Sequence, residues 1–180
     1  MATVTYIIPI HKFDAIVSAR LPEALESIKA SDDNDYTISL VGPKEILGKA
    51  EKVIKKLKLE EVTKYVENED TDVYTQINVA VLRCTSPYFC VVEYDDKITP
   101  YWERRAKEYG KNGASVLLPL NNFFESGNFV SLGNELAWDV SFADENNLGY
   151  ITDKELNVYM DFPVHGAFIK TEDFITIGGL

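Results

Sequence analysis

Three acidic side chains follow directly on an apolar run near the middle of the chain. Residues 88–92 (Tyr-Phe-Cys-Val-Val) carry no charge, and Glu93, Asp95 and Asp96 come immediately after them. A buried strand would deliver these carboxylates to the edge of a sheet, where open α/β sheets bind ligands. Clustered carboxylates repel one another unless a cation lies between them, and such oxygen ligands suit Mg²⁺ or Mn²⁺ bridged to phosphates. The pattern indicates a metal-assisted phosphate site. The alternative is that the strand ends in an ordinary turn whose residues happen to be acidic and bind nothing.

Composition limits the classes of function that the chain can have. Its 180 residues suffice for one domain with a substantial core, and 46% of them are hydrophobic. The formal charge of -11 argues against a nucleic-acid or anionic-membrane surface, since such surfaces are basic. We find no apolar run long enough to span a membrane and no signal peptide at the start. Cys84 and Cys90 form no Cys-x-x-Cys pair, so we expect reduced thiols and a cytoplasmic protein.

The elements that must position these carboxylates alternate along the chain. Short apolar runs predict strands, and longer stretches with apolar residues at helical spacing predict helices. We expect the main part of the first helix to begin near Leu21, because proline is favoured in the first turn of a helix and Pro22 follows. The expected strands are 4–10, 36–41, 62–66, 88–93, 114–120 and 164–170. The expected helices are 13–30, 46–57, 73–83, one starting at 101, a short one at 138–142, and 152–160.

This alternation predicts an α/β fold with a mostly parallel, mixed central sheet and helices on both faces. Residues 121–134 are rich in Asn, Gly, Ser and aromatics, which favours a hairpin or an adaptable loop. The sequence contains no Gly-x-Gly-x-x-Gly, no Walker-type loop and no Gly-x-Ser-x-Gly. The two histidines, His11 and His165, lie far apart in the sequence and give no argument for a zinc site.

Five motifs, in order, resemble the family-2 group of GT-A glycosyltransferases. That group begins with a strand of the type Val-Ile-Ile-Pro-Val-Tyr-Asn, a first helix with Leu-x-Glu-Ala-Leu-x-Ser-Ile, and a helix Asn before the metal motif. An Asp-x-Asp-Asp motif with a later Pro follows, and then Gly-Ala-x-x-Ile-Arg-Arg before Gly-Gly-Phe. The matching segments here are 6–12, 21–28, Asn78, 93–96 with Pro100, and 165–170 with 178–180.

The resemblance implies a GT-A fold and transfer of a sugar, with inversion, from a UDP- or GDP-type nucleotide sugar to a carbohydrate or protein acceptor. It implies a divalent metal, Mn²⁺ or Mg²⁺, held by Glu93, Asp95 and Asp96. The nucleotide-sugar pocket would include Pro9, His11, Asn78 and Asp95. The sugar or acceptor side would include His165 and Gly166.

The resemblance also sets an expected organisation. Residues 1–180 would form a single GT-A-like domain, with 1–100 as its nucleotide-binding half and 101–180 as its acceptor and sugar half. The family places an acidic general base beyond its Gly-Gly-Phe motif, so we expect a longer protein with the base beyond Leu180. Two positions depart from the family pattern. The second strand ends in Gly42 and Pro43 instead of an acidic pair, and Ile77 replaces the usual Arg before the helix Asn.

Two other functions remain open. The first is a non-catalytic GT-A-like module for sugar binding or assembly, in which the aromatic and amide side chains of 121–134 would make the contacts. The second is a nucleotidyltransferase-like enzyme, which shares the nucleotide and metal requirements. Such enzymes usually carry a Gly-rich loop with a basic residue after the first strand, and residues 11–13 (His-Lys-Phe) do not supply one.

Overall fold

The structure is a computed structural model that describes residues 2–111, 113–117, 122–125, 128–132 and 165–180. The chain divides into two compact units. One consists of Met1–Leu117 with His165–Leu180, and the other is Leu118–Val164. The helices predicted at 138–142 and 152–160 lie outside the described residues.

The first unit is built on a sheet with the strand order β3-β2-β1-β4-β8-β5 in its described residues. Strands β1 to β4 run parallel, whereas β8 runs antiparallel to both β4 and β5. The predicted mostly parallel, mixed sheet is therefore confirmed. The strands are β1 (Val4–Pro9), β2 (Tyr36–Gly42), β3 (Thr63–Glu67), β4 (Tyr88–Val91), β5 (Val116–Leu117) and β8 (Phe168–Lys170).

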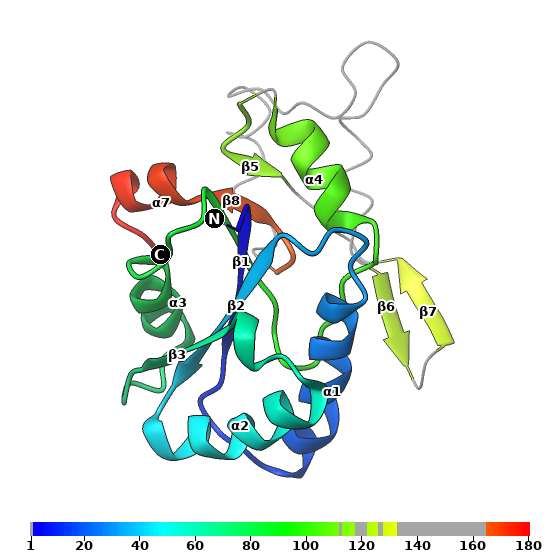
Figure 1. The fold of residues 1–180 in the computed structure, drawn as a ribbon, viewed down its shortest axis with the longest axis vertical. Helices are drawn as coiled ribbons and strands as arrows, with labels where there is room; N and C mark the ends of the chain where they lie inside the picture. Colours follow the sequence, from blue (N-terminus) through cyan, green and yellow to red (C-terminus); the bar gives the residue numbers. More distant parts are fainter. Residues whose placement is uncertain (1, 112, 118–121, 126–127, 133–164) are drawn as a thin grey trace. The chain divides into compact units, whose positions relative to one another are not determined.

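Helices cover both faces of this sheet (Figure 1). Successive side chains of β1 point to opposite faces, so Tyr6 and Ile8 join the main core cluster while Ile7 faces the other way. On the second face Phe89 packs edge-on against Phe174, with ring centroids 4.9 Å apart. The first face carries α1 (Ala15–Lys29), α2 (Lys44–Leu57) and α4 (Trp102–Gly110), and the second carries α3 (Val73–Val81) and α7 (Thr171–Ile177).

The start of α1 corrects the sequence prediction. The helix begins at Ala15, six residues before Leu21, and Pro22 lies inside it. Asp14 explains the early start, because its carboxylate accepts hydrogen bonds from the amides of Ile16 and Val17, each at 3.0 Å. These amides have no acceptor within the helix, so a capping side chain stabilises the first turn. Helix α7 and the short 3-10 helix η1 (Glu60–Val62) were not predicted from the sequence.

The second unit contains an antiparallel hairpin in its described residues. Strand β6 (Asn122–Glu125) pairs with β7 (Asn128–Leu132), with a register shift between Phe123 and Phe124. The hairpin expected within 121–134 is thus confirmed. Among the described helices of both units, none combines the length and the apolar character needed to cross a membrane.

Candidate functional site

Two segments distant in sequence meet at the carboxyl end of β4. Because β8 is antiparallel to β4, the residues that precede β8 lie at the same sheet edge as those that follow β4. His165 forms an isolated parallel bridge with Val91, and the Gly166 amide donates to the Val91 carbonyl at 2.7 Å. The structure therefore places His165 and Gly166 beside the predicted metal motif.

The acidic residues after β4 form a tight turn. The Asp96 amide donates to the Glu93 carbonyl at 3.1 Å, which brings both ends of the turn together. The turn is tied to α1, because the Ile98 amide donates to Ser27 Oγ at 3.1 Å. Glu93 and Asp96 are partly buried, whereas Asp95 is exposed. We refer to residues 93–96 as the acidic turn.

Burial dominates the electrostatics of the acidic turn. Desolvation raises the pKa of Glu93 and the pKa of Asp96, and the Asp95 charge raises both further. His165 opposes the shift in both pKa values, and its Nδ1 lies 3.4 Å from Glu93 Oε1. The negative charge of the turn is therefore only partly compensated, so the turn favours binding of a further cation.

The acidic turn fits a hard cation by its donor chemistry. Its carboxylate oxygens are ligands that Mg²⁺ and Mn²⁺ accept, and excess negative charge attracts them. Within the described parts of the chain, however, no group of three or more His, Cys, Asp and Glu side chains is arranged so that it could hold a metal ion. The assignment of Glu93, Asp95 and Asp96 as ligands stays a prediction.

The residues predicted for the nucleotide pocket occupy different parts of the first unit. Pro9 is the buried last residue of β1, pairing in register with Val41 of β2, and His11 follows two positions later. His11 acts on Glu93 electrostatically, since its charge lowers the pKa of that carboxyl. Both residues thus lie at the sheet edge that carries the acidic turn.

Asn78 has a partner that the sequence does not reveal. Its Nδ2 donates to the Leu180 carbonyl at 2.9 Å, and its Oδ1 accepts from the Leu180 amide at 3.0 Å. Gly179 has a φ of 89°, and a Cβ at Gly179 would lie 2.6 Å from Asn78 Oδ1. Asn78 therefore holds the turn after α7 against α3, where Figure 1 also shows the C-terminus. A nucleotide-facing role for Asn78 stays a prediction.

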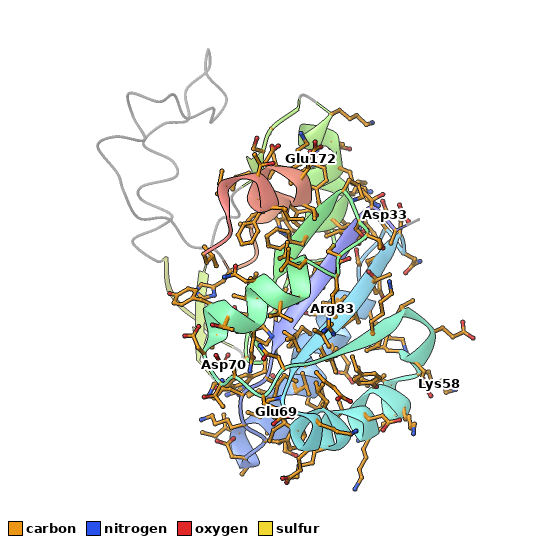
Figure 2. The ribbon with its side chains drawn as sticks, turned by 90° about the vertical axis from the view of Figure 1, so that its left-hand side faces the viewer. Asp33, Lys58, Glu69, Asp70, Arg83 and Glu172 are labelled. Atoms are coloured by element: carbon orange, nitrogen blue, oxygen red, sulfur yellow. The ribbon has the colours of Figure 1, made fainter. Side chains whose placement is uncertain are left out.

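The end of β2 is shaped by a close backbone contact. A Cβ on Gly42 would lie only 2.1 Å from the Ile10 carbonyl oxygen, so the chain needs glycine there. The Gly42 carbonyl accepts from the Asn68 amide at 3.0 Å, which ties it to the loop after β3. That loop carries Glu69 and Asp70, which are labelled in Figure 2. An acidic loop thus lies beside the end of β2, the position at which the resembling glycosyltransferase family carries its acidic pair.

Sequence reasoning missed one residue that contacts the site. The Trp102 indole N–H donates to the Gly166 carbonyl at 2.7 Å, which connects α4 to the segment that carries His165. The only signal in the sequence was a tryptophan at an expected helix start, and the partner of its N–H could not be inferred from that.

A cavity of about 340 Å³ lies away from the acidic turn. Its lining includes Thr3 and Tyr88, which lie at the amino ends of β1 and β4. Ala106, Lys107, Gly110, Lys111 and Phe168 complete the lining. The cavity therefore belongs to the opposite edge of the sheet. The cavity is thus separate from the candidate site.

Comparison with known proteins gives a match in structure only. No protein-family model matches the sequence, and no curated protein matches it. The crystal structure of S. aureus TarS residues 1–349 superposes with a TM-score of 0.71 at 17% identity, covering 98% of this chain and 49% of that one. The same TarS segment in complex with UDP-GlcNAc gives a TM-score of 0.54 at 20% identity, covering 73% of this chain and 37% of that one.

A second enzyme shows the same likeness. The mannosyltransferase PcManGT from Pyrobaculum calidifontis, in complex with GDP-Man and Mn²⁺, has a TM-score of 0.67 at 14% identity. The match covers 98% of this chain and 47% of that one, so this chain spans about half the length of the two solved chains. Identities this low establish the fold alone. The chain therefore has the GT-A glycosyltransferase fold that its sequence motifs imply.

Proposed function

We propose that the chain is a glycosyltransferase domain that transfers a sugar from a nucleotide-diphosphate sugar, with a divalent metal and with inversion at the anomeric carbon. The observation that carries the proposal is the meeting of the acidic turn with His165 at the carboxyl edge of a GT-A sheet. Structures that share this fold hold UDP, UDP-GlcNAc, or GDP-Man with Mn²⁺. This supports a donor of the UDP or GDP type.

The residues of the acidic turn have a specific role in this proposal. Glu93, Asp95 and Asp96 would hold Mn²⁺ or Mg²⁺, which as a Lewis acid offsets the charge that develops on a departing nucleoside diphosphate. The uncompensated charge of the turn supports this role, because burial already disfavours the ionised forms of Glu93 and Asp96. Their ionised state is therefore maintained at a cost that a bound cation would remove.

The remaining predicted residues bind and orient the substrates. Pro9 and His11 would border the nucleotide at the end of β1, and His165 and Gly166 would face the sugar or the acceptor. An acceptor hydroxyl would form the new bond to the anomeric carbon and lose its proton to a general base, as the bond to the diphosphate oxygen breaks on the opposite face and releases the nucleoside diphosphate. Attack from that side inverts the configuration. A carbohydrate or a protein would supply the hydroxyl.

One observation favours a second function, a non-catalytic GT-A-like module for sugar binding or assembly. Across the described residues the side chains do not form a ready metal site. A module that only binds a sugar would not require one. The two functions differ in a measurable property, which is metal-dependent binding of a nucleoside diphosphate.

Calorimetric titration of the chain with UDP and with GDP tests the proposal. We expect one nucleotide to bind in the presence of Mn²⁺ and binding to be lost on addition of EDTA. Asp95→Ala and Asp96→Ala should each weaken binding by at least about 10–100-fold, the range seen when a metal site loses a supporting group. Glu172→Ala is the matched control, because it removes one exposed negative charge from α7, which begins at the end of β8 opposite the acidic turn.

The outcomes separate the two functions. Full binding by both aspartate variants would refute the metal assignment. Absence of binding by the wild-type chain to either nucleotide would favour the non-catalytic module. Equal losses in the aspartate variants and in Glu172→Ala would show a general effect of charge instead of a site.

A further inference from the structure

Trp102 joins the two segments that form the candidate site. It is the first residue of α4, which follows the acidic turn, and its indole N–H donates to the Gly166 carbonyl at 2.7 Å. Its ring also packs edge-on against Phe168, with centroids 5.5 Å apart and planes at 81°. Trp102 therefore contacts β8 by packing and the residues before β8 by a hydrogen bond.

The Gly166 backbone is fixed from two directions. Its amide donates to the Val91 carbonyl at 2.7 Å, and its carbonyl accepts from Trp102, also at 2.7 Å. Its φ of 71° lies in the left-handed region, which glycine adopts without steric strain. The two partners belong to β4 and α4, the elements on either side of the acidic turn. Gly166 is consequently held at a defined place relative to that turn.

This arrangement fixes the neighbouring His165. Its Nδ1 lies 3.4 Å from Glu93 Oε1, and half of the imidazole side chain (51%) remains accessible to solvent. The imidazole thus lies close to one carboxylate and remains half exposed for contact with a ligand. Its position depends on the Gly166 backbone, because the Gly166 amide belongs to the peptide bond that follows His165 and is tied to β4.

We propose that Trp102 is a positioning residue that holds His165 against the acidic turn through the Gly166 carbonyl. The inference rests on the proposed function in one respect, namely that His165 faces the sugar part of the donor. Tryptophan suits the role because its N–H only donates and its ring fills the space beside Phe168. Phenylalanine would preserve the packing and remove the donor.

The test compares Trp102→Phe, His165→Ala and the double variant by titration with the sugar-bearing donors UDP-GlcNAc and GDP-Man. Trp102→Phe should weaken binding by about 3–10-fold, the range expected for one neutral hydrogen bond. In the His165→Ala background the same change should have little further effect, because the residue through which Trp102 acts is gone. Equal, additive losses in both backgrounds would overturn the inference and leave Trp102 with a general structural role.

Tyr88→Phe is a matched control. The Tyr88 hydroxyl lies 3.4 Å from the Gly110 carbonyl at the other end of α4 and 3.3 Å from the Ala114 carbonyl, so its loss removes a donor that this helix shares with the residues after it. Nucleotide binding by Tyr88→Phe should match the wild type. A loss as large as that of Trp102→Phe would show that any weakening of the contacts of α4 has this effect, which contradicts a specific role for Trp102.

A spectroscopic readout separates this inference from the proposed function. The chain has two histidines and two tryptophans, so the imidazole and indole signals are easily assigned by NMR. Trp102→Phe should shift the imidazole resonances of His165 and leave those of His11 unchanged; unchanged His165 resonances would refute the positioning role. Should the wild type bind no nucleotide, the proposed function fails while this readout still decides the inference.

A measurement on the wild-type chain covers the case in which Trp102→Phe does not fold. A hydrogen bond of 2.7 Å to Gly166 should protect the Trp102 indole N–H from exchange with solvent. His165→Ala should leave this protection intact, since the bond goes to the backbone of the next residue. Rapid exchange in the folded wild type would contradict the inference.

Discussion

The same substitution, glycine to alanine, should have opposite effects on stability at two positions of this chain. At Gly42 the added Cβ would lie 2.1 Å from the Ile10 carbonyl oxygen, and real Cβ contacts essentially never fall below 3.0 Å. The ends of β1 and β2 would therefore have to separate. At Gly48, in the exposed part of α2, a Cβ would have no neighbour within 4 Å.

The structure sets the size of both effects. Overpacking costs about 1–3 kcal/mol, and separating the strands also endangers the 2.8 Å hydrogen bond from the Ile10 amide to Val41, worth about 1 kcal/mol. We expect Gly42→Ala to lower the free energy of unfolding by about 2–4 kcal/mol. Gly48→Ala should raise it by about 0.4–1 kcal/mol, because alanine favours a helix interior and restricts the unfolded chain.

Urea unfolding followed by tryptophan fluorescence measures both free energies. Each variant is compared with the wild type at the same pH. A change in the urea midpoint reports a change in stability when the slope of the free energy against urea stays the same. A Gly42→Ala variant as stable as the wild type would refute the reasoning about strand separation. Destabilisation by both substitutions to the same extent would show that alanine acts through something other than local space.

Two further changes test the acidic turn and the first helix. Asp96→Asn should raise the free energy of unfolding at pH 7 in EDTA by about 0.5–2 kcal/mol, although it removes a proposed ligand. Burial raises the pKa of Asp96, so the folded state binds the Asp96 proton more tightly than the unfolded state does. This tighter proton binding stabilises the wild type fully below about pH 4, and the stabilisation is lost as the pH rises. The advantage of the variant should therefore vanish on acidification, and a pH-independent difference would contradict this. Asp14→Ala should lower the thermal midpoint, because it removes the acceptor for the amides of Ile16 and Val17; an unchanged midpoint would mean that water replaces this cap.

The sequence contained enough information to predict the sheet and most of its helices. Short apolar runs such as 4–10 and 88–92 favour buried strands, and their alternation with amphipathic stretches predicts a parallel sheet. The wrong prediction for the start of α1 has a local cause. Pro22 looked like a helix start, but the carboxylate of Asp14 caps an earlier turn and the helix continues through the proline.

The candidate site was predicted in its residue types but not in its contacts. The acidic turn follows from an apolar run that ends in carboxylates, and the resemblance supplied His165 and Gly166. The bond from Trp102 to the Gly166 carbonyl links residues 64 positions apart, and it depends on the antiparallel direction of β8. Likewise, the amide of Asn78 binds the Leu180 backbone, 102 positions away. Backbone partners at such separations leave no pattern in a single sequence.

The position of the second unit in the chain has a consequence for how this fold can vary. The segment Leu118–Val164 leaves the sheet after β5 and returns at His165, just before β8, and β5 and β8 pair with each other. The strands on either side of it are thus held together by their own pairing. For a chain closed between two paired strands, doubling the number of residues in between adds only about 0.6 kcal/mol of closure entropy. The fold can therefore accept a longer, shorter or exchanged segment at this point while the strands that carry the acidic turn stay in register.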